Sequence, residues 1–195
     1  MPNKQRLGYF PQYLERRAMK LKNLFICKNT EASIEFIEGF KPDIVVNATG
    51  SVPLLPNIPG LKENLEAGNV STIFDLVDHV DSYPEDLSGK KVVVIGGGNV
   101  AIDVARNSKR CGDVNVSMFC LEDREHMPAS EEEIEEATEE GIKVNCGWGP
   151  KEIIVKDGKV DSIVLKKCLS VMDYDGRFNP TYDENRNKLT IVLSR

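Results

Sequence analysis

The chain has 195 residues, of which 41% are hydrophobic and 29% are charged, and its formal net charge is −6. This composition is typical of a globular protein of roughly one domain or one and a half, and it excludes wholesale disorder and collagen-like repeats. The acidic balance argues against a general nucleic-acid or anionic-membrane binder, because phosphate contacts need clustered lysine and arginine.

The acidity is local. Seven glutamates between Ser130 and Gly141 account for more than the whole net charge, and no lysine or arginine lies among them. Such a run usually forms the solvated face of a helix, so the net charge says little about a ligand.

The apolar runs and the cysteine and histidine content restrict the cellular compartment and the kinds of site that the chain can have. No apolar run approaches the roughly 20 residues that cross a bilayer, and the first residues do not form a secretory signal. None of the five cysteines forms a C-x-x-C motif, which argues against a disulfide framework and a Cys-ligated metal. The two histidines are too few for a His-based metal site. We therefore expect a cytoplasmic protein with reduced thiols and no metal.

The first part of the chain predicts short elements followed by an extended connector. Apolar spacing predicts helices over 11–22 and 30–38 and strands over 24–27 and 43–50. Pro53, Pro56 and Pro59 have fixed φ angles that favour an extended segment there.

Residues 61–89 carry weaker patterns, with a short helix around 72–80 and a polar hinge at 83–89. Periodicity then predicts an alternation of strands and helices that is typical of a parallel sheet. The expected elements are a strand over 90–95, a helix over 99–110, a strand over 114–119 and an acidic helix over 131–140.

Ser130 and Glu133 have the spacing of a capping box, which would begin the acidic helix. Beyond Pro150 the period changes to two, and residues 152–166 predict a hairpin whose Asp157-Gly158 suits a type I′ turn. A last strand is expected over 189–193.

The strongest chemical signal is the glycine turn between the 90–95 strand and the 99–110 helix. It reads Gly96-Gly97-Gly98-Asn99-Val100-Ala101 and fits G-x-G-x-x-A in the required strand–helix context. In this motif Gly96 permits the tight turn, Gly98 lets the backbone approach a pyrophosphate, and Ala101 lets helix and strand pack closely. The amide groups and dipole at the helix start favour negative charge. The sequence therefore predicts a dinucleotide site, against the alternative of a turn chosen only for packing.

The end of the next strand distinguishes NAD from NADP. Glu122 lies about 20 residues beyond Ala101, where an acid hydrogen-bonds the ribose 2′-OH. A carboxylate there would repel a 2′-phosphate, whereas Arg124 would attract one; both could instead be solvated loop charges. We expect NAD(H) to be favoured over NADP(H).

Two stretches resemble one family. Residues 91–106, with Arg124-Glu-His-Met-Pro-Ala-Ser-Glu-Glu-Glu133, are similar to the pyridine-nucleotide domain of flavoproteins resembling the glutamate synthase small subunit. Arg16-Arg17-Ala18 and Lys41-Pro-Asp-Ile-Val-Val-Asn-Ala-Thr-Gly50 resemble the matching region of that family. They equally resemble the C-terminal half of NADH:flavin oxidoreductases of the dienoyl-CoA and enoate reductase type.

The resemblance implies an α/β, Rossmann-like FAD/NAD(P)-binding fold: a parallel sheet with helices, an antiparallel β-meander and a partial second FAD-type domain. It implies a partial FAD-domain segment over 1–60, a connector over 61–88 and an NAD(P)H-binding domain over 89–195. The cofactor contacts expected are those of the turn, with Glu122, Arg124 and Gly50. An arginine pair suited to NADPH in the glutamate synthase-like proteins is absent near Cys120-Leu121-Glu122, which places their NADPH preference in question for this chain.

By this resemblance, NAD(P)H would pass hydride to FAD in an intact oxidoreductase, with an unidentified electron acceptor in a fused or separate domain. We expect FAD to be held only in the intact protein, and this chain alone to be inactive. No catalytic side chain is singled out, because the two cofactors supply the chemistry. The alternatives are a stand-alone Rossmann module that senses NAD(H) without catalysis, and a transferase that binds S-adenosylmethionine at the same turn.

Overall fold

The computed structural model describes residues 5–50, 52, 54–78, 86–183 and 188–193. The chain divides into two units, Asn3–Leu54 and Leu55–Arg195, and each is considered by itself. Within the described ranges, no helix is both long and apolar enough to span a membrane.

The Asn3–Leu54 unit contains η1 (Gln5–Gly8), α1 (Tyr9–Ala18) and α2 (Ile34–Gly39). Ser33 caps α2 by accepting a hydrogen bond from the Phe36 amide at 3.2 Å. The strands expected over 24–27 and 43–50 are wrong, because neither segment forms a strand. A strand is stabilised by its neighbours, and here the apolar side chains are exposed, at 88% for Phe25 and 81% for Ile44.

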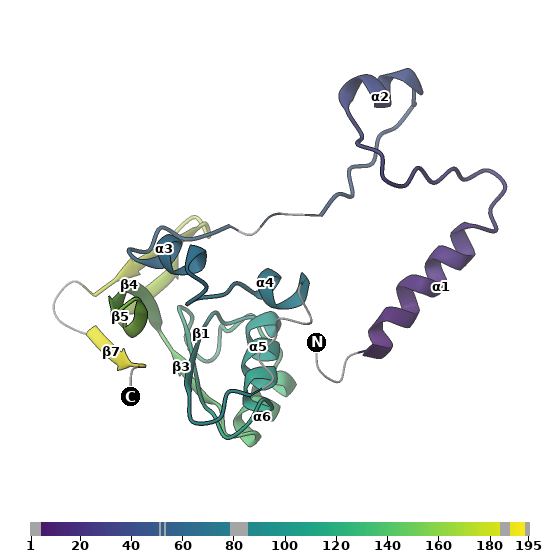
Figure 1. Ribbon diagram of the computed structural model, residues 1–195. Helices are drawn as coiled ribbons and strands as arrows, with labels where there is room; N and C mark the ends of the chain where they lie inside the picture. Colours follow the sequence, from purple (N-terminus) through teal and green to yellow (C-terminus); the bar gives the residue numbers. More distant parts are fainter. Residues whose placement is uncertain (1–4, 51, 53, 79–85, 184–187, 194–195) are drawn as a thin grey trace. The chain divides into compact units, whose positions relative to one another are not determined.

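The Leu55–Arg195 unit is built on a parallel sheet in the order β1-β2-β3. Its strands are β1 (Lys91–Ile95), β2 (Asn115–Cys120) and β3 (Lys143–Cys146). The connections are α5 (Asn99–Lys109) and α6 (Glu131–Glu139), which lie side by side on one face of the sheet (Figure 1). β1, α5, β2 and α6 confirm the predicted elements to within one residue, whereas β3 was not predicted.

Alternation along β2 creates two apolar layers. Met118 and Cys120 point into the core shared with α5 and α6, whereas Phe119 points to the opposite face. There Phe119 packs with Ile163 and Leu165 of the antiparallel sheet. The parallel sheet is therefore covered on both faces, as its continuous apolar strands require.

The antiparallel sheet is formed by β4 (Trp148–Lys156), β5 (Lys159–Met172), β6 (Phe178–Tyr182) and β7 (Lys188–Val192), with β5 pairing to the other three. Asp157 and Gly158, between β4 and β5, have φ angles of 52° and 72°. Positive φ at both positions is the type I′ geometry, so the predicted hairpin is confirmed. β7 confirms the last expected strand, whereas β6 was not predicted; its central Pro180 argues against a strand in the sequence.

The expected connector packs against this sheet. It contains α3 (Leu61–Glu66) and α4 (Ile73–Asp78); the predicted helix beyond residue 78 and residues 83–85 of the predicted hinge lie outside the described residues. The Ile153 amide donates to the Pro59 carbonyl at 3.0 Å, and the Asn69 side chain donates to the Gly158 carbonyl at 3.0 Å. The structural division thus falls between Leu54 and Leu55, and the functional division at 60 and 88 stays a prediction.

Candidate functional site

The first glycine of the turn fixes the distance between β1 and α5. Gly96 has a φ of +145°, a region that side chains rarely adopt, and a Cβ added there would lie 3.1 Å from the Ala101 Cβ. Its amide donates to the Phe119 carbonyl at 2.9 Å. Gly96 and Ala101 therefore serve the close packing of strand and helix.

The next two glycines face different surroundings. A Cβ at Gly97 would lie 2.8 Å from Glu122 Oε2 and 2.9 Å from the Cys120 Cβ, so the end of β2 closes this position. A Cβ at Gly98 would meet no protein atom within 4 Å, and Gly98 has an extended backbone with a φ of −93°. Among the residues that the structure describes, nothing requires glycine at position 98, and the open space beside it can admit a ligand.

That open space lies at the start of α5. The Ala101 and Ile102 amides both donate to the Gly98 carbonyl, and no side chain of Gly98 can cap the helix. The first amide groups of a helix have no partner within it, and its dipole places partial positive charge at the same end. Val100, in this first turn, is 56% exposed. The arrangement suits an anionic group such as a pyrophosphate.

A segment before α6 holds the turn in place. The Ala129 amide donates to the Gly97 carbonyl at 3.0 Å, and the Ser130 amide donates to Asn99 Oδ1 at 2.8 Å. The side-chain oxygen of Asn99 thus helps to hold the turn, and the expected contact of Asn99 with a cofactor stays a prediction. Reasoning from residues alone missed Ala129 and Ser130, although the Met-Pro-Ala-Ser segment that contains them carried part of the family resemblance.

The prediction of a capping box at the start of α6 is wrong. Ser130 is the N-cap of α6, but its side chain makes no cap hydrogen bond, and the Glu133 carboxylate pairs with Arg106 of α5 at 3.0 Å. The Ser130 amide, which a capping box would pair with Glu133, donates to Asn99 Oδ1 instead.

The two specificity candidates differ in their surroundings. Glu122 is half-buried beside Gly97, and its backbone carbonyl accepts from the Gly147 amide at 2.8 Å. Arg124 is exposed and forms a two-point pair with Glu131 of α6, at 2.9 and 2.5 Å. The hydrogen bond from Arg124 lowers the pKa of Glu131 and correspondingly raises that of Arg124. The structure thus places Glu122 at the turn and engages Arg124 with the acidic helix.

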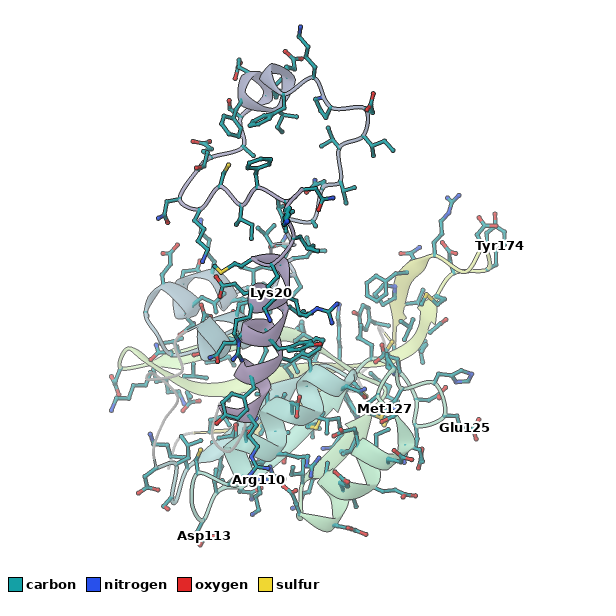
Figure 2. All side chains as sticks on the ribbon, turned by 90° about the vertical axis from the view of Figure 1, so that its right-hand side faces the viewer. Lys20, Arg110, Asp113, Glu125, Met127 and Tyr174 are labelled. Carbon is teal, nitrogen blue, oxygen red and sulfur yellow. The ribbon has the colours of Figure 1, made fainter. Side chains whose placement is uncertain are left out.

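The intervening loop is shaped by Asp123. Its carboxylate accepts from the Glu125 and His126 amides and lies 2.7 Å from His126 Nδ1. The hydrogen bond with Asp123 raises the pKa of the His126 ring. Glu125 and Met127 of this loop are labelled in Figure 2; Met127 is 8% exposed, so it anchors the loop to the core.

One of the expected cofactor contacts belongs to the other unit. Gly50 lies in the Asn3–Leu54 unit and has a φ of +83°. Its expected contact with a cofactor stays a prediction. Among the residues that the structure describes, no cluster of three His, Cys, Asp or Glu side chains could hold a metal ion.

Solved structures with a similar arrangement define the class of fold. FprA from Mycobacterium tuberculosis, in a mutant form, matches with a TM-score of 0.70 at 19% identity, over 98% of this chain and 58% of that one. FprA described as in complex with NADPH matches with a TM-score of 0.56 at 21% identity, over 72% of this chain and 46% of that one. The fold is that of the Rossmann-like FAD/NAD(P) reductases.

Sequence comparison adds the family. Residues 18–178 match the family described as pyridine nucleotide-disulphide oxidoreductase. This chain belongs to that family of oxidoreductases.

Curated relatives agree with this assignment. A putative glutamate synthase [NADPH] small chain of Cereibacter sphaeroides is 40% identical over 103 residues, which are 53% of this chain and 25% of that protein. The beta subunit of an NADP(+)-dependent formate dehydrogenase of Moorella thermoacetica is 34% identical over 103 residues, 52% of this chain and 14% of that protein. The resemblance to the glutamate synthase small subunit is confirmed, and the chain spans about a quarter or less of these relatives.

Proposed function

We propose that the Leu55–Arg195 unit binds the pyrophosphate of NAD(P)H at the glycine turn, and that in the intact oxidoreductase the nicotinamide passes hydride to FAD. The observation that carries the first part is the open space beside Gly98 at the start of α5. Family membership supports the second part, since pyridine nucleotide and flavin together define these oxidoreductases.

In this proposal the chain binds and orients rather than reacts. Gly96 and Ala101 set the helix against the strand, while Gly98 and the first amides of α5 receive the pyrophosphate. Ala129 and Ser130 hold the turn rigid, so little ordering of the backbone accompanies binding. The nicotinamide supplies the hydride, and residues 1–60 form part of the FAD-binding domain with further sequence of the intact protein.

The binding step is tested by titrating the full chain with NADH, NADPH and S-adenosylmethionine in a calorimeter. Saturable binding of at least one pyridine dinucleotide is expected, without binding of S-adenosylmethionine. Binding of S-adenosylmethionine alone would favour a transferase. If neither dinucleotide binds, the glycine turn serves only the packing of helix against strand.

The choice between NADH and NADPH rests on Glu122. The relatives named above carry NADPH or NADP(+) in their descriptions, so they do not support a preference for NADH. The local charge does favour it, because a carboxylate beside Gly97 can accept from a ribose hydroxyl and repels a 2′-phosphate.

Glu122→Ala is therefore expected to weaken NADH by about fivefold, the loss of one hydrogen bond, and to leave NADPH equal or stronger. Calorimetric titration of both cofactors measures the difference. Glu122→Gln keeps an acceptor without the charge, so it should retain NADH while improving NADPH. An equal loss for both cofactors would remove Glu122 from the specificity argument.

A further inference from the structure

Two thiols end neighbouring strands of the parallel sheet. Cys120 is the last residue of β2 and Cys146 the last of β3, and the strand register pairs them directly. Both side chains lie on the face covered by α5 and α6. Neighbouring strands are about 4.8 Å apart, which lies within the Cα separation of about 4.4–6.8 Å that a disulfide requires.

Both sulfur atoms contact the loop of the candidate site. Cys120 Sγ lies 3.6 Å from the Glu122 carbonyl oxygen, and Cys146 Sγ lies 3.6 Å from Met127 Sδ. Both thiols therefore support the loop between β2 and α6 that carries Glu122.

Their surroundings give them different reactivity. Cys120 is 3% exposed, and burial raises the pKa of its thiol to about 12, so it is a poor first nucleophile. Cys146 is half-buried, so it is the more accessible of the two thiols. An oxidant from solution would meet Cys146 first, and Cys120 lies beside it as the second thiol.

We propose that Cys120 and Cys146 are a redox modification site that closes to a reversible disulfide on reaction with a peroxide. The Cys146 sulfur attacks one oxygen of hydrogen peroxide as the O–O bond breaks. Cys146 becomes a sulfenic acid, and the departing hydroxide takes the thiol proton to form water. The Cys120 sulfur then attacks the sulfenic sulfur, the S–O bond breaks, and the released hydroxide takes the Cys120 proton. Two thiols lose two electrons, and one peroxide becomes two waters.

Disulfide formation would alter the site beside it. The bond draws the sulfur atoms to about 2.05 Å, which removes the thiol donor to Glu122 and moves Cys146 away from Met127. Both contacts hold the loop that carries Glu122. We expect the oxidised protein to bind pyridine dinucleotide more weakly, a consequence that rests on the function proposed above.

Peptide mapping of the full chain after peroxide treatment tests the linkage. Trypsin cleaves after Arg110, Arg124, Lys143 and Lys151, which separates the two thiols into different peptides. A linked pair lighter by two hydrogens is expected, with fragment ions that assign Cys120 rather than Cys111, and dithiothreitol should restore both thiols. Oxidation of Cys27 with Cys120 and Cys146 still reduced, or another pairing, would overturn the proposal.

Two variants test the order of the steps. In Cys120→Ala the sulfenic acid on Cys146 has no second thiol and should be trapped by dimedone, whereas Cys146→Ala should give no adduct on Cys120. Cys168→Ala, a buried thiol on β5, is the matched control and should leave the linkage unchanged. A dimedone adduct on Cys120 in the Cys146→Ala protein would contradict the assigned order.

The consequence for binding is separable from the linkage. NADH titration of reduced and oxidised protein should show weaker binding only after oxidation, and no change in Cys146→Ala. If the reduced protein binds no dinucleotide while the disulfide forms, the proposed function fails and the modification site stands. If binding occurs but no disulfide forms, only this proposal is overturned.

Discussion

Replacing Gly98 by alanine is expected to weaken NAD(P)H binding by at least about tenfold, or about 1.4 kcal/mol, without unfolding the protein. The added methyl group would occupy the space where a Cβ meets no protein atom within 4 Å. The φ of −93° at Gly98 is accessible to alanine, so the folded chain accepts the substitution. The penalty falls on the ligand, whose pyrophosphate can no longer approach the backbone.

Two further glycines make this result specific. Gly39→Ala also adds a methyl group in open space, but on α2 in the other unit, and should leave binding unchanged. Gly97→Ala places its methyl group against Glu122 and the Cys120 Cβ, so it should reduce stability as well as binding. Calorimetry measures affinity, and fluorescence of Trp148, the single tryptophan, reports folding of the Leu55–Arg195 unit. Unchanged affinity in a folded Gly98→Ala protein would show that the turn is structural.

The elements that were predicted correctly are those that pack against one another within the Leu55–Arg195 unit. Strands β1 and β2 pair with each other, helices α5 and α6 cover them, and the Asp157-Gly158 turn is specified by local backbone preference. Residues 24–27 and 43–50 have equally apolar patterns, but no described residue of the Asn3–Leu54 unit is buried. A buried-strand pattern therefore predicts a requirement for neighbours rather than the strand itself.

The candidate site was predicted only as far as the motif extends along the chain. Gly96, Gly98 and Ala101 act through their own backbone or size, which local sequence specifies. The Ala129 and Ser130 amides are supplied to the turn by hydrogen bonding, and Cys120 meets Cys146 through strand register. These contacts join residues distant in sequence, and neither spacing nor composition encodes them. The glutamate run suggested a solvated face, and three of its members also pair with Arg106 of α5 or with Arg110, the residue after that helix.

Removal of the Arg106 side chain is the second large effect expected. Its guanidinium is 16% exposed and binds three carboxylates of the α6 segment, those of Glu133 at 3.0 Å, Glu136 at 2.6 Å and Glu140 at 2.9 Å. Arg106→Met keeps much of the side-chain volume but leaves these acids close together without their shared cation. We expect a loss of about 2 kcal/mol in the free energy of unfolding at neutral pH, because Glu133 and Glu136 lose this partner and Glu140 keeps only Arg110.

The pH dependence separates this electrostatic loss from a packing defect. Burial alone would raise the pKa of Glu140, but hydrogen bonds from Arg110 and Arg106 together hold it below its ordinary value. A carboxyl whose pKa is lower in the folded state stabilises the protein above its unfolded pKa, about 4.3, and that contribution is lost as the pH falls through the folded value. The wild-type and Arg106→Met proteins should therefore converge in stability under acid. Denaturant unfolding followed by Trp148 fluorescence at neutral and acidic pH measures this, and a difference that persists undiminished in acid would assign the effect to packing. Lys62→Met, which removes an exposed pair 4.0 Å from Glu66, is the matched control and should change stability by no more than about 0.5 kcal/mol.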